Sequence, residues 1–133
     1  MIYLDTAALV KLVRVERESG ALVEWLDKRG NERLVSSALV EVELPRALRR
    51  SEPRVLGGVA AVIARLYRVE INAAVRATAG AYTEPRLRSL DAIHLATAEL
   101  LVASDQTITA FVTYDNRLAE AAKHAGFAVV APE

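Results

Sequence analysis

Cysteine is absent from the 133 residues of the chain, and only two histidines are present, His94 and His124. The lack of cysteine excludes a disulfide framework, a thiolate zinc site and a cysteine nucleophile. Two histidines are too few for a three-histidine metal site. No run of about 18 or more apolar residues is present, and no signal peptide is recognisable, so we expect a soluble, cytoplasmic protein without a membrane span.

An excess of charge of one sign is also lacking, because 17 Lys and Arg residues balance 17 Asp and Glu residues. A positive field over the whole protein is therefore excluded as a means of attracting nucleic acid, and such binding needs local patches or a bound cation. Apolar residues make up 53% of the chain. That share is enough for a packed core, and we expect a single domain over residues 1–133.

Short apolar segments alternate with segments of helical periodicity. The sequence predicts strands at residues 2–4, 34–36, 67–70, 111–114 and 127–130. Helices are expected in the stretches 8–13, 19–29, 39–50, 59–66, 73–82, 90–102 and 116–125. Strands that are apolar throughout are typical of a parallel sheet with helices on both faces. We therefore predict an α/β fold, a three-layer α/β/α sandwich with a central parallel sheet of about five strands.

Two residues make local predictions within this scheme. Pro45 lies in the stretch 39–50, and it must occupy the first turn of that helix or kink it, because proline lacks a backbone donor. Ser89 precedes the stretch 90–102 and is predicted to be its N-cap, since a serine hydroxyl can accept a free backbone N–H of the first turn.

Three of the five aspartates fall at the ends of predicted elements. Asp5 ends the first strand, Asp115 ends the fourth, and Asp91 lies in the first turn of a helix. Ligands of parallel α/β sheets collect at the carboxyl ends of the strands, where these side chains can meet. Glu41 and Glu43 follow the second strand, so one of them could join the group.

Helix capping explains any one of these acids taken alone. Several carboxylates at one sheet edge repel one another, however, and the repulsion costs stability unless a cation lies among them. Oxygen ligands in a chain without cysteine suit Mg²⁺ or Mn²⁺ rather than zinc. An acid cluster that holds Mg²⁺ is typical of enzymes that act on phosphodiester bonds.

Four segments of the chain carry a family resemblance. They are residues 2–8 (IYLDTAA), 36–43 (SSALVEVE), 87–98 (LRSLDAIHLATA) and 112–118 (VTYDNRL). On these segments the chain resembles the PIN-domain ribonucleases, and more narrowly the VapC toxins of bacterial toxin–antitoxin pairs. The resemblance extends over essentially the whole chain, and the segment around Asp91 is the most specific.

The resemblance implies four acids around one or two divalent cations. These positions fall on Asp5, Glu43, Asp91 and Asp115. Asp5 and Asp91 would bind Mg²⁺, or Mn²⁺, directly. Glu43 and Asp115 would bind through water, hold a second metal or orient the attacking water. The family spacing selects Glu43 over Glu41, whereas helical periodicity alone does not decide between them.

Other residues near the four acids have alternative interpretations. The hydroxyls of Thr6 and Thr113 could support a water network, and Asn116 stands where many relatives carry a further acid. His94 follows Asp91 by one turn, and we expect a hydrogen-bonded helix histidine rather than a ligand or an acid.

Arginines and one tryptophan complete the candidate residues. Arg46, Arg49, Arg50 and Arg54 could bind RNA phosphates or form a solvated helix face. Arg86, Arg88 and Arg117 flank the acids, so they could neutralise them, meet substrate or form structural salt bridges. Trp25 and Leu22 are expected in the core, and could also line a groove for a partner helix.

The resemblance implies a Mg²⁺-dependent endoribonuclease that hydrolyses RNA phosphodiester bonds. It also implies a homodimer inhibited by a cognate VapB-like antitoxin, and we expect an arginine of that partner to reach the four acids. The alternative is a non-catalytic PIN-like module that binds RNA or protein, which the presence of all four acids disfavours. A phosphoacceptor receiver domain is disfavoured because the paired acids and the lysine that it needs are missing.

Overall fold

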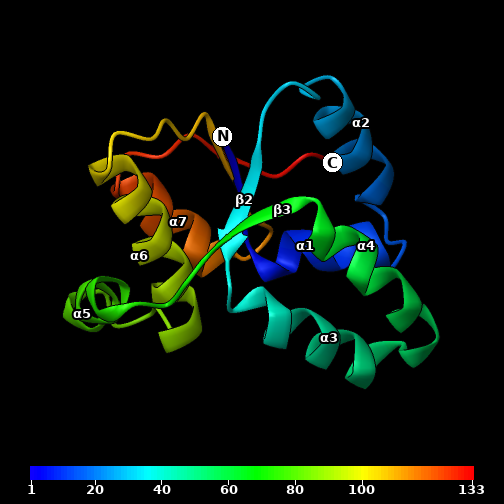
Figure 1. The fold of residues 1–133 in the computed structure, drawn as a ribbon, viewed down its shortest axis with the longest axis horizontal. Coiled ribbons are helices and arrows are strands. Elements are labelled where there is room, and N and C mark those ends of the chain that lie inside the picture. The colour runs from blue at the N-terminus through cyan, green and yellow to red at the C-terminus, as the bar shows by residue number, and fades with distance from the viewer.

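A computed structural model describes all residues, 1–133, around one central sheet (Figure 1). The sheet has five strands in the order β3-β2-β1-β4-β5, and every neighbouring pair is parallel. The strands are β1 (Ile2–Leu4), β2 (Leu34–Ser37), β3 (Leu66–Val69), β4 (Ala110–Val112) and β5 (Val129–Val130). The predicted parallel sheet of about five strands is confirmed.

Helices cover both faces of the sheet, as Figure 1 shows. One layer holds α1 (Thr6–Val13), α2 (Ser19–Asp27), α3 (Val40–Ser51) and α4 (Val59–Ala64), with the short 3₁₀ helix η1 (Pro53–Gly58) between the last two. The other layer holds α5 (Ala73–Ala81), α6 (Ser89–Ala103) and α7 (Asn116–His124). The three-layer α/β/α arrangement is therefore also confirmed.

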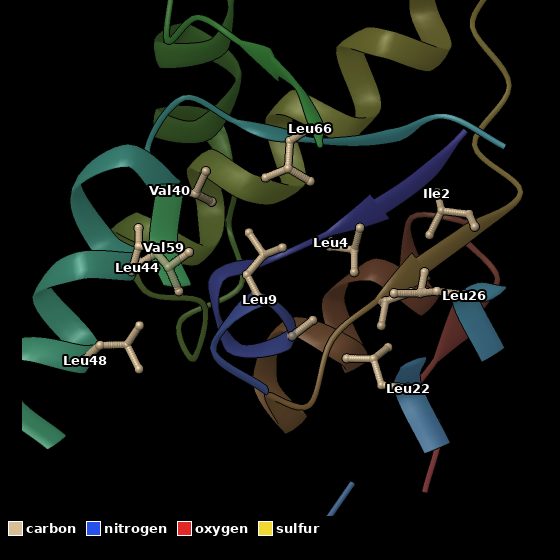
Figure 2. Close-up of a cluster of buried hydrophobic side chains, with 12 residues drawn as sticks. Ile2, Leu4, Leu9, Leu22, Leu26, Val40, Leu44, Leu48, Val59 and Leu66 are labelled. Carbon is tan, nitrogen blue, oxygen red and sulfur yellow. The ribbon is translucent and has the colours of Figure 1, made fainter. Parts of the chain in front are cut away.

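The two cores follow from the alternation of side chains along the strands. On one face, Ile2 and Leu4 of β1 pack against α1 to α4 through leucines such as Leu9 and Leu44, all with no exposed surface (Figure 2). On the other face, Tyr3 lies against β4 and the helices α6 and α7. Because both faces are covered, the central strands β1 and β4 are buried at every position, whereas the edge strand β3 exposes Tyr67 and Arg68.

One local prediction is wrong, and for Pro45 the first of the two predicted alternatives does not hold. Arg88 with an extended backbone is the N-cap of α6, so Ser89 is the first helical residue and caps nothing. Pro45 lies in the second turn of α3 rather than the first, because helical bonding already starts at Ala38, whose carbonyl accepts from the amide of Glu41. The turn at residues 38–39 therefore places one full helical turn before Pro45.

The last strand is shorter than the predicted 127–130. The amide of Phe127 donates to the carbonyl of Ala122 at the end of α7, so it is not available for the sheet. Gly126 makes this bond possible with a positive φ of 96°, a conformation that glycine adopts without strain. None of the helices combines the length and the apolar character that a membrane crossing needs.

Candidate active site

Asp5 is the most buried acid of the chain, with 3% of its surface exposed. It follows β1 and caps α1, because its Oδ1 accepts the amide of Ala8 at 2.9 Å. Its Oδ2 accepts the hydroxyl of Thr113. Burial raises the pKa of Asp5 to about 6, and the nearby charge of Asp115 adds to the rise, whereas His94 and the two hydrogen bonds oppose it.

Asp115 follows β4 and lies beside Asp5 because β1 and β4 are neighbours in the sheet. Its Oδ1 accepts the amide of Leu118 at 2.9 Å and caps α7. The hydroxyl of Thr113 joins the two acids, since it donates to Asp5 and accepts the amide of Asp115 at 3.1 Å. The capping interpretation is thus correct for both aspartates, and it accounts for only one oxygen of Asp115.

Asp91 lies in the first turn of α6 and accepts no hydrogen bond from the protein. Burial raises its pKa, and the charges of Asp115 and Glu43 raise it further, whereas His94 and Arg88 lower it. The charges of Asp115 and Glu43 therefore both act on Asp91 and disfavour its ionised form.

Glu43 is the fourth acid and is held by two side chains. Its Oε1 accepts the hydroxyl of Thr6 at 2.6 Å and lies 3.0 Å from Nε2 of His94. Burial alone would raise the pKa of Glu43, but the hydrogen bonds to His94 and Thr6 outweigh burial and hold the pKa below its ordinary value. Its Oε2 makes no hydrogen bond within the protein.

The second glutamate of the pair points elsewhere. Glu41 is exposed, and its Oε1 pairs with Arg68 of β3 at 3.2 Å. The structure thus brings Glu43, and not Glu41, to the side where the aspartates lie.

His94 is buried, with 2% of its surface exposed, and both ring nitrogens have partners, so the expected hydrogen-bonded helix histidine is confirmed. Nδ1 lies 2.9 Å from the hydroxyl of Tyr3. Burial raises the pKa of Tyr3 far above its ordinary value, so this hydroxyl stays protonated and can donate. In the neutral imidazole the proton then lies on Nε2, where Glu43 accepts it. The role of Tyr3 leaves no signal in the sequence, because this residue lies within an apolar strand.

Arginine does not neutralise the aspartates. Asp5, Asp91 and Asp115 form no ion pair, although the chain has 17 basic residues. Of the arginines expected to flank the acids, Arg86 pairs with Glu120 at 3.5 Å instead. Arg88 forms no ion pair with Asp91, and its charge only lowers the pKa of that acid.

The donor set suits a hard divalent cation, because it consists of carboxylates and three of the four, Asp5, Asp91 and Asp115, lack a basic partner in the chain. No group of three or more His, Asp or Glu side chains is arranged to hold a metal ion as the side chains stand. The free oxygens of Asp91, Asp115 and Glu43 leave room for such an arrangement, because they are not committed to hydrogen bonds within the protein. The chemistry of the donors therefore fits Mg²⁺ or Mn²⁺. Their side chains, as positioned in this structure, do not form a coordination shell.

Leu22 and Trp25 lie on α2. Leu22 is fully buried, as expected, whereas Trp25 is only partly buried against the same core, with the guanidinium of Arg29 4.0 Å from the centroid of its ring. The expectation of a core position therefore holds in full for Leu22 and in part for Trp25.

Comparison with known proteins gives consistent matches. The PIN domain family model matches residues 2–124. Ribonuclease VapC35 of Mycobacterium tuberculosis is 59% identical over 132 residues, which cover 99% of this chain and 97% of the relative. Ribonuclease VapC46 of the same organism is 40% identical and covers 98% of this chain and 97% of the relative.

Two solved structures are similar in fold. VapC20 of Mycobacterium tuberculosis, described as a toxin that cleaves the sarcin–ricin loop, matches with a TM-score of 0.74 at 19% identity, over 99% of this chain and 100% of that chain. VapBC2 from Rickettsia felis, bound to a DNA fragment from its promoter, matches with a TM-score of 0.65 at 14% identity, over 100% of both chains. By sequence over its full length and by fold, the chain belongs to the PIN-domain family and, within it, to the VapC-type toxins.

Proposed function

We propose that this chain is a metal-dependent endoribonuclease and the toxin of a toxin–antitoxin pair, with Mg²⁺ as its cation and Mn²⁺ as a substitute. The observation that carries the proposal is the set of four interacting acids, three of which have no basic partner. Such a set costs stability unless a cation is part of the working site. The relatives named ribonucleases, at up to 59% identity, support RNA as the substrate.

Each acid has a role that fits its surroundings. Asp5 and Asp91 would hold the cation, since Asp5 is fixed by two hydrogen bonds and Asp91 has both oxygens free. The bound cation supplies a water molecule of lowered pKa and stabilises the developing charge on the leaving oxygen. Asp115 would complete the set with the oxygen that it does not use as a helix cap.

Glu43 is placed to orient the attacking water. Its Oε1 is held by Thr6 and His94, which fixes the direction in which Oε2 points. Its lowered pKa keeps the carboxylate ionised at neutral pH, so that Oε2 can accept a proton from water. A water held in this way attacks the phosphorus in line with the leaving oxygen.

A VapB-like antitoxin is the proposed partner. The structure from Rickettsia felis holds VapB and VapC together, and its VapC shares this fold. Four carboxylates attract a guanidinium as they attract a metal ion, so an arginine of the antitoxin would block the site by bidentate pairing. We also propose a cytoplasmic homodimer, as the family resemblance implies.

The proposal is tested by cleavage of a total RNA preparation and of a single-stranded oligoribonucleotide. Wild type is expected to cleave in Mg²⁺ or Mn²⁺, and chelator is expected to stop the reaction. Asp91→Asn should lose cleavage while its near-UV circular dichroism stays native. RNA binding without cleavage in either metal would instead support the non-catalytic PIN-like module, and cleavage that persists in chelator would contradict the role of the metal.

A further inference from the structure

The helices α1 and α3 lie side by side in Figure 1. Residues of both helices line a groove that begins at Glu43. Its first part is a hollow of about 370 Å³ lined at one end by Thr6 and Glu43 and further along by Arg46 and Arg50. A second hollow of about 410 Å³ shares Arg50 with the first and continues towards Lys11. We call the two together the α1–α3 groove.

The free positive charge of the α1–α3 groove comes from α3. Arg46 and Arg50 are exposed and form no ion pair or hydrogen bond in the chain. Lys11 and Arg14, at the far end, are already paired with acids, Lys11 with Glu18 at 2.8 Å and Arg14 with a neighbouring glutamate at 3.2 Å. Arg46 and Arg50 are therefore the unpaired positive charges that line the groove next to Glu43.

The spacing of the two arginines suits a repeating anion. Arg46 follows Glu43 by three residues and Arg50 follows Arg46 by four, so all three lie on one side of α3. Four residues of helix separate the Cα atoms of Arg46 and Arg50 by about 6 Å along the axis. Like charges at this spacing destabilise an isolated helix slightly, and neighbouring phosphates of a single strand would remove that repulsion.

We infer that the α1–α3 groove holds the sugar–phosphate backbone of the RNA strand beside the bond to be cut, with Arg46 and Arg50 on successive phosphates. The inference rests on the proposed function, because it assigns the path of the substrate into the same site. The four acids repel RNA, and two unpaired guanidinium groups next to Glu43 offset that repulsion.

The groove is built for phosphates rather than for bases. Small apolar side chains, Ala7 and Ala47, line it between the arginines and α1. The aromatic ring at its far end, Tyr114, is not free for stacking, because Lys11 lies 4.7 Å from its centroid and its hydroxyl donates to Pro132. Contacts to phosphates position a strand without selecting its sequence, so binding in this groove is independent of sequence.

The test measures binding of fluorescein-labelled oligouridylate and oligoadenylate by anisotropy, in chelator, over a range of salt concentrations. The double variant Arg46→Gln, Arg50→Gln is expected to lower the slope of log K against log salt by about 1.4, because two phosphate contacts are lost. At about 0.1 M salt this amounts to binding that is on the order of twentyfold weaker. The loss should be equal for the two oligonucleotides.

The matched control removes the same charge elsewhere. Arg33 and Arg65 are exposed and form no ion pair, and neither lines the groove. The variant Arg33→Gln, Arg65→Gln should bind as wild type does. Equal losses in the two double variants, or no loss in the groove variant, would overturn the inference, as would a loss confined to one oligonucleotide. Cleavage by wild type is assayed separately in Mg²⁺, so a failure of the groove and a failure of the nuclease are told apart.

Discussion

Nε2 of His94 lies 3.0 Å from Oε1 of Glu43, and this contact joins α6 to α3 between residues 51 positions apart. The opposite nitrogen of the ring lies 2.9 Å from the hydroxyl of Tyr3. The imidazole is thus oriented from the sheet and in turn orients an acid of the site. A residue that fixes a site carboxylate in this way acts as a positioning residue.

The first prediction concerns this positioning role. His94→Ala should lower cleavage by about 10- to 100-fold, the usual effect of removing a residue that orients a metal or water ligand. Tyr3→Phe should give a smaller loss, because the imidazole stays but loses the group that orients it. NMR of the side-chain carboxyl carbon of Glu43 gives the readout that a purely structural role would not change. The pKa of Glu43 should rise in His94→Ala, since burial remains while a hydrogen bond that lowers the pKa is lost.

The second prediction compares the two glutamates of α3. Glu43→Gln should reduce cleavage on the order of a hundredfold or more, because the amide does not accept the proton of the attacking water. Glu41→Gln is the matched control, since Glu41 is exposed and pairs only with Arg68. Its cleavage rate should stay close to that of wild type. If the order of the two effects is reversed, Glu41 takes the role assigned to Glu43.

The third prediction links the metal to stability. Mg²⁺ that binds only the folded protein stabilises it by about 2.7 kcal/mol at a concentration of about 100 Kd. For a domain of this size the melting temperature then rises by on the order of 10 °C. Asp91→Asn should be as stable as wild type or more stable in chelator, because burial and the neighbouring acids disfavour the ionised aspartate. The same variant should lose most of the response to Mg²⁺.

Thermal melting of both proteins, in chelator and in excess Mg²⁺ at constant ionic strength, checks the third prediction. The prediction fails if wild type melts at the same temperature in both conditions and Asp91→Asn is equally destabilised in both. Asp91 would then be a structural residue and not part of a metal site.

The fourth prediction follows from the pKa of Asp5, which burial raises from 3.8 to about 6. A raised pKa means that the folded protein binds a proton between about pH 4 and pH 6 that the unfolded chain does not bind. In chelator, the ionised Asp5 therefore costs stability at neutral pH, on the order of 3 kcal/mol, and the cost disappears as the pH falls to about 4.

Asp5→Asn checks the fourth prediction, because the side-chain oxygen of asparagine can still accept the amide of Ala8 and its NH₂ group can donate to the hydroxyl of Thr113. In urea titrations the variant should exceed wild type in stability at about pH 7, and the difference should shrink towards about pH 4. A difference that does not change with pH would show that Asp5 ionises without a penalty.

The order of helices and strands was predictable because helical periodicity and apolar runs both show which residues are buried. Features that depend on contacts between residues far apart in the sequence were not predictable. The choice of Glu43 over Glu41 depends on His94 and Thr6, and helical periodicity treats both glutamates alike. The link between Tyr3 and His94 spans 91 positions and leaves no local trace in the sequence.

Predictions from local sequence preferences were wrong where a neighbouring residue or helix end determined the structure instead. Ser89 is a good cap by type, but the extended residue before α6 is Arg88, so the hydroxyl comes one position too late. Phe127 has strong strand propensity, but its amide is taken by the end of α7. The position of Asp5 and Asp115 at the sheet edge was predictable because Asp5 directly follows β1 and Asp115 follows β4 by three residues.

The hydrogen bond from Thr113 to Asp5 joins positions 108 residues apart. During synthesis, therefore, Asp5 is made 108 residues before its partner Thr113. A nascent chain that stops before residue 110 contains Asp5, Glu43 and Asp91 but has no β4 to place beside β1. The four acids thus come together only after β4 has been synthesised, so a translation product that stops earlier lacks the proposed site.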